Sequence, residues 1–277
     1  MKKISRRSFM AAAAVSVAAL ALTACGGSAS SAASSVASSA ASSEAASSAA
    51  AELTTVEAGK LTMATNATFP PYEMTTDSGE LEGIDVDTAK AIAEKLGLEL
   101  QIDDMDFDAA LLSVQQGKAD IVMAGVTVTD ERKAVMDFSD SYATGIQSII
   151  VPNDSDIASP DYLAGKKIGT QRGTTGYIYC SDDFGEDSVV AYDSGLTAVQ
   201  ALNNGQVDAV VIDNAPATEY VAANPGLKVL DTSYAEEDYA IGMAKGSALE
   251  DAVNKALEEL KADGTLQAIV DKYINAN

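Results

Sequence analysis

Short apolar runs alternate with amphipathic segments along most of the chain. Apolar runs of four to six residues suit strands of a parallel sheet covered on both faces, and they lie at residues 60–65, 98–102, 120–124, 146–151, 166–170, 189–192, 208–213 and 227–230. Helices with both ends defined are predicted at 83–97, 247–262 and 265–274. Two more are predicted to begin at 106–108 and at 129–131, two to end at about 180 and at 202, and one to lie around 219. Asp85 or Asp87 is the expected N-cap of the first helix. This alternation predicts an α/β fold with a mostly parallel sheet in the second half.

The stretch at residues 119–132, ADIVMAGVTVTDER, combines a predicted buried strand with polar groups at its end. Gly125 lets a ligand approach the backbone, and Thr127 offers a hydroxyl. Arg132 falls in the first turn of a predicted helix, where the helix dipole disfavours a cation. We therefore expect Arg132 either to bind an anion such as a carboxylate, or to lie at the surface paired with an adjacent acid.

A second copy of this pattern occurs later in the chain. Residues 112–125, LSVQQGKADIVMAG, align without gaps to residues 200–213, QALNNGQVDAVVID. Each copy predicts a helix end, a glycine stop, a turn and a strand. The strand ends carry Gly125 in the first copy and Asp213 in the second. Because open α/β sheets bind ligands at the carboxyl ends of their strands, the two units predict a cleft between them, unless the similarity arose by chance.

The N-terminal segment has the pattern of an export leader. Residues 2–7 are basic, residues 9–22 are apolar, and LTAC at 22–25 resembles a bacterial lipobox. Residues 1–24 are accordingly expected to be a signal peptide and Cys25 a lipidated residue, with cleavage near Ala24 without lipidation as the alternative. The motif SRRSF at 5–9 also resembles a twin-arginine signal. Residues 25–52 are almost entirely Ser and Ala beyond Gly27, which predicts a disordered tether.

Composition excludes several kinds of chemistry. The 277 residues carry 41 acidic and 18 basic side chains, a net charge of −23, so nucleic acid is not an expected partner. The chain contains no His, which removes His-dependent triads and imidazole metal sites. Cys180 is expected to be a buried apolar residue. We expect no metal, no cofactor and a monomer.

Several motifs together resemble the bacterial extracellular solute-binding proteins of family 3, the polar amino acid receptors of ABC importers. They are NATFPPYE at 66–73, GIDVD at 83–87, MDFD at 105–108, AGVTVTDER at 124–132, DFSDSY at 137–142, GTTG at 173–176 and VID at 211–213. The resemblance implies a type II periplasmic-binding-protein-like fold, in which two doubly wound α/β lobes are joined by two crossing strands. The expected lobes are residues 53–151 plus 240–277, and residues 152–239. An ABC permease of the cytoplasmic membrane is the implied partner, and the implied location is extracytoplasmic and lipid-anchored.

The resemblance also implies which residues hold the ligand. Arg132 takes its carboxylate with Thr174 and Thr175, while Gly125, Thr127 and Asp213 hold its ammonium group. The remaining implied contacts come from one asparagine and three aromatic residues: Asn66, Phe69, Tyr72 and Phe107, with Tyr142 as an alternative to Tyr72 for closing the pocket. For Asp213 alone, a helix cap is the simpler interpretation. Neither Arg132 nor Asp213 is expected to support the core.

The identity of the ligand stays open at this point. Asn66 stands where several receptors for cationic amino acids carry an acid, which favours a neutral polar amino acid. An enzyme of the dehydratase type on the same scaffold is an alternative, with Glu73 as its candidate acid or base. An amino acid sensor module is a second alternative. The sequence does not distinguish general secretion from twin-arginine export.

Overall fold

The computed structural model describes residues 53–274, which fall within one compact unit of the chain. The predicted leader, Cys25 with its predicted lipidation and the whole predicted tether lie outside the described residues. Within 53–274, none of the helices combines the length and apolar character that crossing a membrane requires.

The first lobe is built on a five-stranded sheet with the order β5-β1-β6-β14-β7. Its strands are β1 (Lys60–Thr65), β5 (Glu99–Asp104), β6 (Ile121–Val122), β7 (Met136–Phe138) and β14 (Gly242–Ala244). β1 is parallel to β5 and β6, whereas β14 is antiparallel to β6 and β7. A small antiparallel sheet of β2 (Thr68–Phe69), β3 (Glu73–Thr75) and β4 (Leu81–Glu82) occupies part of the predicted 66–73 loop.

The second lobe repeats this order as β10-β9-β11-β8-β12, with β13 also paired to β8. Its strands are β8 (Ala143–Pro152), β9 (Ile168–Gln171), β10 (Val189–Tyr192), β11 (Ala209–Asp213), β12 (Leu227–Val229) and β13 (Ala235–Tyr239). The prediction of a mostly parallel sheet is wrong here, because β8, β12 and β13 are antiparallel to their neighbours. β8 enters from the first lobe without a helical crossover, so it need not run parallel to the β9-β11 pair.

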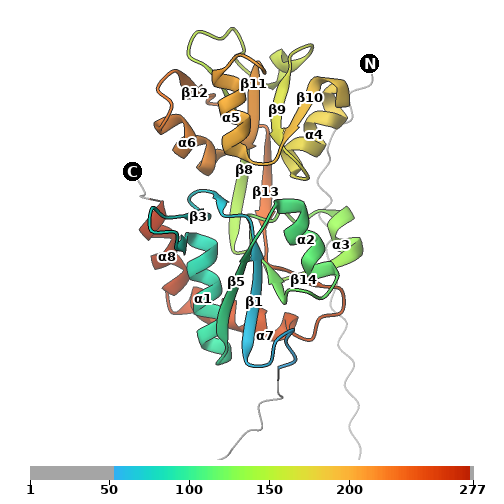
Figure 1. Cartoon of the computed structure of the whole chain (residues 1–277), viewed down its shortest axis with the longest axis vertical. Coiled ribbons are helices and arrows are strands. Elements are labelled where there is room, and N and C mark those ends of the chain that lie inside the picture. The colour runs from blue at the N-terminus through green and yellow to red at the C-terminus, as the bar shows by residue number, and fades with distance from the viewer. Residues whose placement is uncertain (1–52, 275–277) are drawn as a thin grey trace, which may run out of the picture. The chain divides into compact units, whose positions relative to one another are not determined.

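Two strands connect the lobes. Figure 1 shows β8 and β13 running side by side between the two sheets, and they pair antiparallel from Ala143 to Gln147. The chain therefore changes sheet between β7 and β8, and returns between β13 and β14. The two crossing strands are as predicted. The lobe boundaries at 151/152 and 239/240 stay a prediction.

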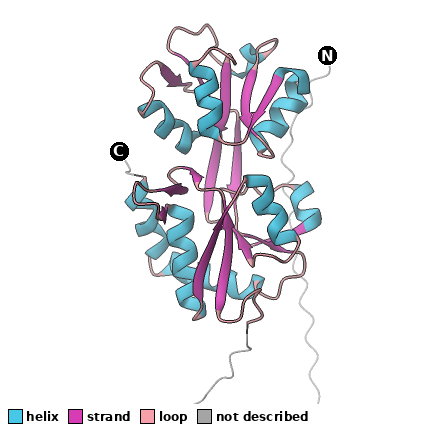
Figure 2. Ribbon diagram, viewed as in Figure 1, coloured by secondary structure: helices cyan, strands magenta, loops and turns pink. Residues whose placement is uncertain are grey.

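Helices cover both faces of each sheet, which gives a three-layer arrangement in both lobes (Figure 2). The helices are α1 (Ile84–Leu96), α2 (Phe107–Gln115), α3 (Asp130–Val135), α4 (Thr175–Phe184), α5 (Gly195–Asn203), α6 (Asn214–Ala222), α7 (Glu250–Ala262) and α8 (Thr265–Tyr273), with 3-10 turns at Pro160–Leu163 and Glu186–Ser188. Consecutive β11 residues belong to two different cores: Val210 and Ile212 to one, Val211 to the other. This two-sided burial explains the continuous apolar runs. Cys180 is buried as predicted.

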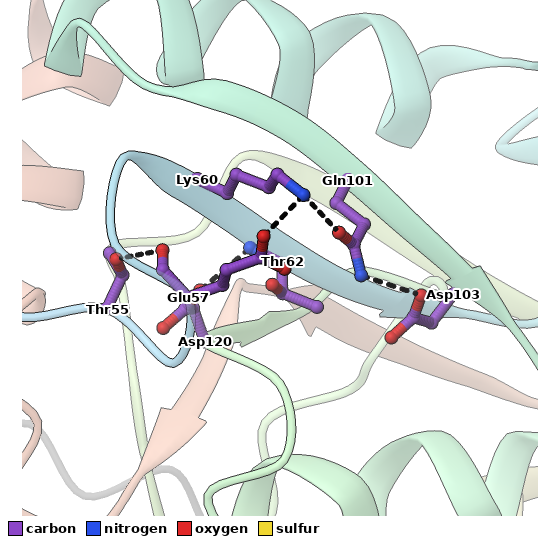
Figure 3. Close-up of polar contacts among 7 residues, drawn as sticks. All are labelled: Thr55, Glu57, Lys60, Thr62, Gln101, Asp103 and Asp120. Carbon is purple, nitrogen blue, oxygen red and sulfur yellow. Dashed lines mark hydrogen bonds and ion pairs between the residues drawn. The ribbon is translucent and has the colours of Figure 1, made fainter.

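The internal repeat is confirmed at the level of the backbone. α2 and α5 each end two residues before a left-handed glycine, Gly117 with φ 66° and Gly205 with φ 67°. The aligned Asp120 then accepts the backbone N–H of Thr62 on β1 at 2.7 Å (Figure 3), and Asp208 accepts that of Lys167 at 2.7 Å. Each aspartate thus ties the start of its own strand to the neighbouring strand.

Two local predictions are wrong. The N-cap of α1 is Gly83 with φ 137°, not Asp85 or Asp87, because α1 begins in direct contact with the backbone of residue 72 and a Cβ at position 83 would lie 2.1 Å from the Tyr72 carbonyl. The strand predicted at 120–124 covers only β6, because the chain turns away at Gly125, whose φ is 56°.

Candidate functional site

A cavity lies where strand ends of the two lobes meet. Its lining comes from both sheets: Asn66, Phe69, Glu73, Phe107, Ala124, Gly125, Thr127, Arg132, Gln147, Gln171, Thr174, Thr175, Ile212, Asp213 and Tyr239. Counted with its opening to solvent, the empty space between the lining atoms is about 410 Å³, of which about 20 Å³ admits the centre of a water-sized sphere. Asn66, Gln171 and Asp213 follow or end β1, β9 and β11, so the carboxyl ends of parallel strands form the cavity as predicted.

Arg132 is the cation of the cavity wall. Thr129 caps α3 by accepting the backbone N–H of Arg132 at 3.2 Å, which holds Arg132 in the first turn. Its guanidinium donates to the carbonyls of Thr127 at 2.7 Å and Gly173 at 3.1 Å, and lies 5.4 Å from the centre of the Phe107 ring. It is 9% exposed and forms no ion pair within residues 53–274, so the surface interpretation is excluded. Burial lowers the pKa of Arg132 below its usual value.

Asp213 lies across the cavity as the N-cap of α6. Its Oδ1 accepts the backbone N–H of Ala215 at 2.9 Å and its Oδ2 that of Ile146 at 2.7 Å. Burial raises the pKa of Asp213 to about 6, although these two hydrogen bonds oppose the shift. The cap interpretation is therefore correct and compatible with a place in the cavity wall. Because the carboxylate also holds backbone groups, the expectation that Asp213 has no structural role is wrong.

Thr127 and Thr175 meet across the two lobes. Their hydroxyls lie 3.4 Å apart, and Thr127 also donates to Glu237 at 3.1 Å. Gln147 donates to the same Glu237 oxygen at 2.9 Å. Thr174 begins α4 as its N-cap and donates its hydroxyl to the Gln171 carbonyl at 2.8 Å. These groups form a hydrogen-bonded wall between Arg132 and β13.

Asn66 makes a second contact between the lobes. Its side-chain oxygen accepts from Gln171 at 2.9 Å and from Thr68 at 2.9 Å, and its side-chain nitrogen donates to the Met105 carbonyl at 2.8 Å. Its amide is thus used mainly within the protein. Together with the bond from Arg132 to Gly173, these contacts hold the two lobes against each other in this structure.

The aromatic residues differ in part from expectation. Phe69 and Phe107 line the cavity, whereas Tyr72 and Tyr142 do not. The Tyr72 ring stacks on Phe69 with centroids 5.8 Å apart and meets Tyr239 edge-on at 5.4 Å, so it lies behind Phe69. Tyr239, from the crossing strand β13, takes the place in the wall that was expected of Tyr72 or Tyr142.

Glu73, the candidate acid or base of the enzyme alternative, also lines the cavity. It is fully buried, and neither carboxyl oxygen has a hydrogen-bond partner within residues 53–274. Burial and the nearby charge of Asp85 raise its pKa well above the usual 4.5. An unpaired buried carboxyl is costly unless it is protonated or meets a cation.

Sequence reasoning missed several lining residues. Gln171 ends β9, so the strand-end rule that found Asp213 could also have found it. Gln147 and Tyr239 lie on the crossing strands, and no local signal marks them. Ala124 and Ile212 also line the cavity. Within the described part of the chain, no group of acidic, Cys or His side chains could hold a metal ion.

The two mixed sheets, the two crossing strands and the cavity between the lobes define a type II periplasmic binding protein. The sequence profile of the bacterial extracellular solute-binding proteins, family 3, matches residues 61–276. This chain belongs to that family.

Known relatives and structures cover most of the chain. The L-cystine-binding protein TcyJ of Escherichia coli strain K12 is 33% identical over 225 residues, 80% of this chain and 85% of TcyJ. The structure of the arginine-, lysine-, histidine-binding protein ArtJ from Geobacillus stearothermophilus is 34% identical with a TM-score of 0.76, covering 79% of this chain and 96% of ArtJ. The structure of an ancestral arginine-binding protein bound to arginine is 44% identical with a TM-score of 0.75, and the match covers 78% of this chain and 99% of the ancestral protein.

Proposed function

We propose that this protein captures arginine outside the cytoplasm and delivers it to an ABC permease. The observation that carries the proposal is the carboxyl of Glu73, which lines the cavity, is fully buried and belongs to no ion pair among residues 53–274. A side chain that brings a positive charge would supply the missing partner.

The charges of the cavity match those of arginine. Arg132 binds the ligand carboxylate with Thr174 and Thr175, while Asp213, Thr127 and the Gly125 carbonyl bind its ammonium group. That pairing accounts for the zwitterion common to all amino acids. Glu73 then remains as a second acid of the cavity wall with no ion-pair partner among residues 53–274, which suits a ligand of net positive charge.

The neighbouring aromatic rings favour a guanidinium over an ammonium. Phe69 and Phe107 both line the cavity, and a flat delocalised cation stacks on such rings better than a compact ammonium does. The similar proteins described above that bind arginine support the same choice. Asn66 alone favoured a neutral ligand, but its amide is already bonded within the protein, so it carries less weight than Glu73.

A panel of four ligands tests this proposal. Arginine is expected to bind most tightly, followed by citrulline, its neutral isostere, and by glutamine, whereas glutamate should not bind because its carboxylate would face Glu73. Isothermal titration calorimetry of the purified protein with each ligand measures the order. Citrulline binding as tightly as arginine would contradict the proposal.

The protein is further proposed to be a lipoprotein, with Cys25 as the lipidated first mature residue, modified by acyl chains such as palmitate. The lipobox at residues 22–25 and the Ser/Ala tether support this part of the proposal. A protein anchored in this way would stay close to its permease after closing on its ligand.

Cell fractionation tests the anchor. The wild-type protein is expected in the membrane fraction, and the Cys25→Ala variant in the soluble or secreted fraction, because the acyl chains that partition into lipid are lost. Cys180→Ser, which changes the other cysteine of the chain, is the matched control and should fractionate like wild type. Equal partitioning of the wild type and Cys25→Ala would overturn the lipobox interpretation.

We propose a binding protein rather than an enzyme or a sensor. A buried acid of raised pKa such as Glu73 also occurs at catalytic sites, but the relatives named above are binding proteins.

A further inference from the structure

A second buried carboxyl, that of Asp85, interacts with Glu73. Asp85 is fully buried in the first turn of α1 and does not line the cavity. Its position relative to Glu73 is set by backbone contacts: Ile84 N–H donates to the Pro71 carbonyl at 3.0 Å, and Asp85 N–H donates to the Tyr72 carbonyl at 2.9 Å. Gly83 permits this approach because it has no Cβ.

The two carboxyls use their hydrogen-bonding capacity unequally. Asp85 Oδ2 accepts the N–H of Gly125 at 2.9 Å, whereas its Oδ1 has no partner that meets hydrogen-bond geometry, as is also true of both Glu73 oxygens. Neither carboxyl belongs to an ion pair within residues 53–274. Asp85 therefore has a fixed backbone donor that favours its charged form, whereas Glu73 has no backbone donor among residues 53–274.

The groups around the pair do not supply a compensating cation. The titratable groups that interact with one or both carboxyls are Tyr142 at the start of β8, Tyr72, Tyr220 of α6 and Asp104 of β5. Asp213 and Arg132 share the cavity wall with Glu73. Tyrosines stay neutral at ordinary pH and Asp104 adds negative charge, so two charges at Glu73 and Asp85 would be unfavourable together.

We propose that Glu73 and Asp85 share one proton in the ligand-free protein, and that a guanidinium-bearing ligand displaces this proton into solvent. Asp85 thereby acts as a positioning residue that sets the pH at which the site accepts a cationic amino acid. Burial supports this assignment, since it raises the pKa of Glu73 and brings that of Asp85 to about 6. The inference rests on the proposed function, because it requires a ligand that carries a positive side chain.

The sign of the pH dependence follows from proton balance. In the ligand-free protein, Glu73 keeps its proton at pH values above the usual pKa of a glutamate. A bound arginine side chain favours the charged form of Glu73, so binding of arginine releases this proton. The affinity for arginine is therefore expected to rise with pH. The rise is about tenfold per pH unit over the pH range in which Glu73 is protonated in the free protein and charged in the complex. Citrulline carries no side-chain charge and does not require this proton to leave.

Calorimetry of arginine and citrulline in two buffers of different ionisation enthalpy counts the released protons. Asp213, whose pKa is raised to about 6, meets the α-ammonium of both ligands and therefore contributes equally to both. The wild-type protein is expected to release about one more proton with arginine than with citrulline at pH values between the usual pKa of a glutamate and the raised pKa of Glu73. The same number of protons released with both ligands would overturn the inference.

The Asp85→Asn variant tests the role of Asp85 separately. An asparagine oxygen can still accept the Gly125 N–H, while the side-chain NH₂ can donate to Glu73 and favour its charged form. In this variant the extra proton release with arginine is expected to disappear. The ratio of the arginine affinity to the citrulline affinity should then become nearly independent of pH. An unchanged pH slope in a folded Asp85→Asn protein would contradict the role given to Asp85.

The outcomes separate this inference from the proposed function. Tight binding of arginine without extra proton release would overturn the shared proton and leave the proposed function standing. Absence of arginine binding at every pH would overturn both.

Discussion

Replacing Arg132 by Met is expected to weaken the binding of arginine and citrulline alike, by about 30-fold or more. Both ligands carry the same carboxylate, and without Arg132 that charge would be buried with no cation. Truncating one partner of such a buried charge pair typically costs about 2–5 kcal/mol, and each 1.4 kcal/mol is about a factor of ten in affinity. Methionine retains most of the length of the side chain, so the variant limits the loss of packing around Phe107.

Calorimetric titration measures this effect, with Lys133→Met as the matched control. Lys133 is the next residue of α3, but its side chain is exposed and does not line the cavity. The control removes the same charge from the same helix and should bind both ligands almost normally. Near-normal affinity in Arg132→Met, or an equal loss in Lys133→Met, would mean that the carboxylate binds elsewhere.

Replacing Glu73 by Gln is expected to abolish most of the preference for arginine over citrulline. The guanidinium would face a neutral amide in a buried site, which should weaken arginine by about 30-fold or more. Citrulline should bind almost as in wild type, because an amide can donate to or accept from its ureido group. A change confined to one ligand distinguishes Glu73 from Arg132, whose loss affects both.

The affinity ratio of arginine to citrulline is the quantity to measure, since general damage to the cavity would affect both ligands. Glu82→Gln is the matched control: Glu82 lies on β4 beside β3 and is not part of the cavity lining. It should leave the ratio unchanged. If Glu73→Gln keeps the wild-type ratio, the cationic side chain is not recognised by Glu73.

Residues at strand ends could be predicted because local patterns mark them. The internal repeat located Gly125 and Asp213 at equivalent strand ends, and the helix start located Arg132 in a first turn. All three residues line the cavity. The same rule would have found Gln171, because β9 is parallel to β11 and ends at the same edge of the sheet.

Other parts of the site depend on contacts between distant segments. Tyr239 reaches the cavity because β13 pairs with β8 over the crossing, and Gln147 because β8 also pairs with β11. Asp85 has the sequence context of a helix cap, yet its carboxylate accepts the N–H of Gly125 instead. A local pattern reports on neighbours a few residues away and contains no information on such partners.

The sequence by itself determined the α/β class, the repeated helix-strand unit, the absence of imidazole chemistry, and the family to which the motifs belong. These properties follow from periodicity, composition and motif spacing, which are local or additive along the chain. Tertiary structure decided which of many acids in a chain of 41 acidic residues lost its solvent. Only the packing of α1, β3 and the cavity wall buries Glu73 and Asp85 together. Because desolvation depends on everything that surrounds a charge, the burial on which the proposed cationic ligand rests could not be read from Asn66 or any other single position.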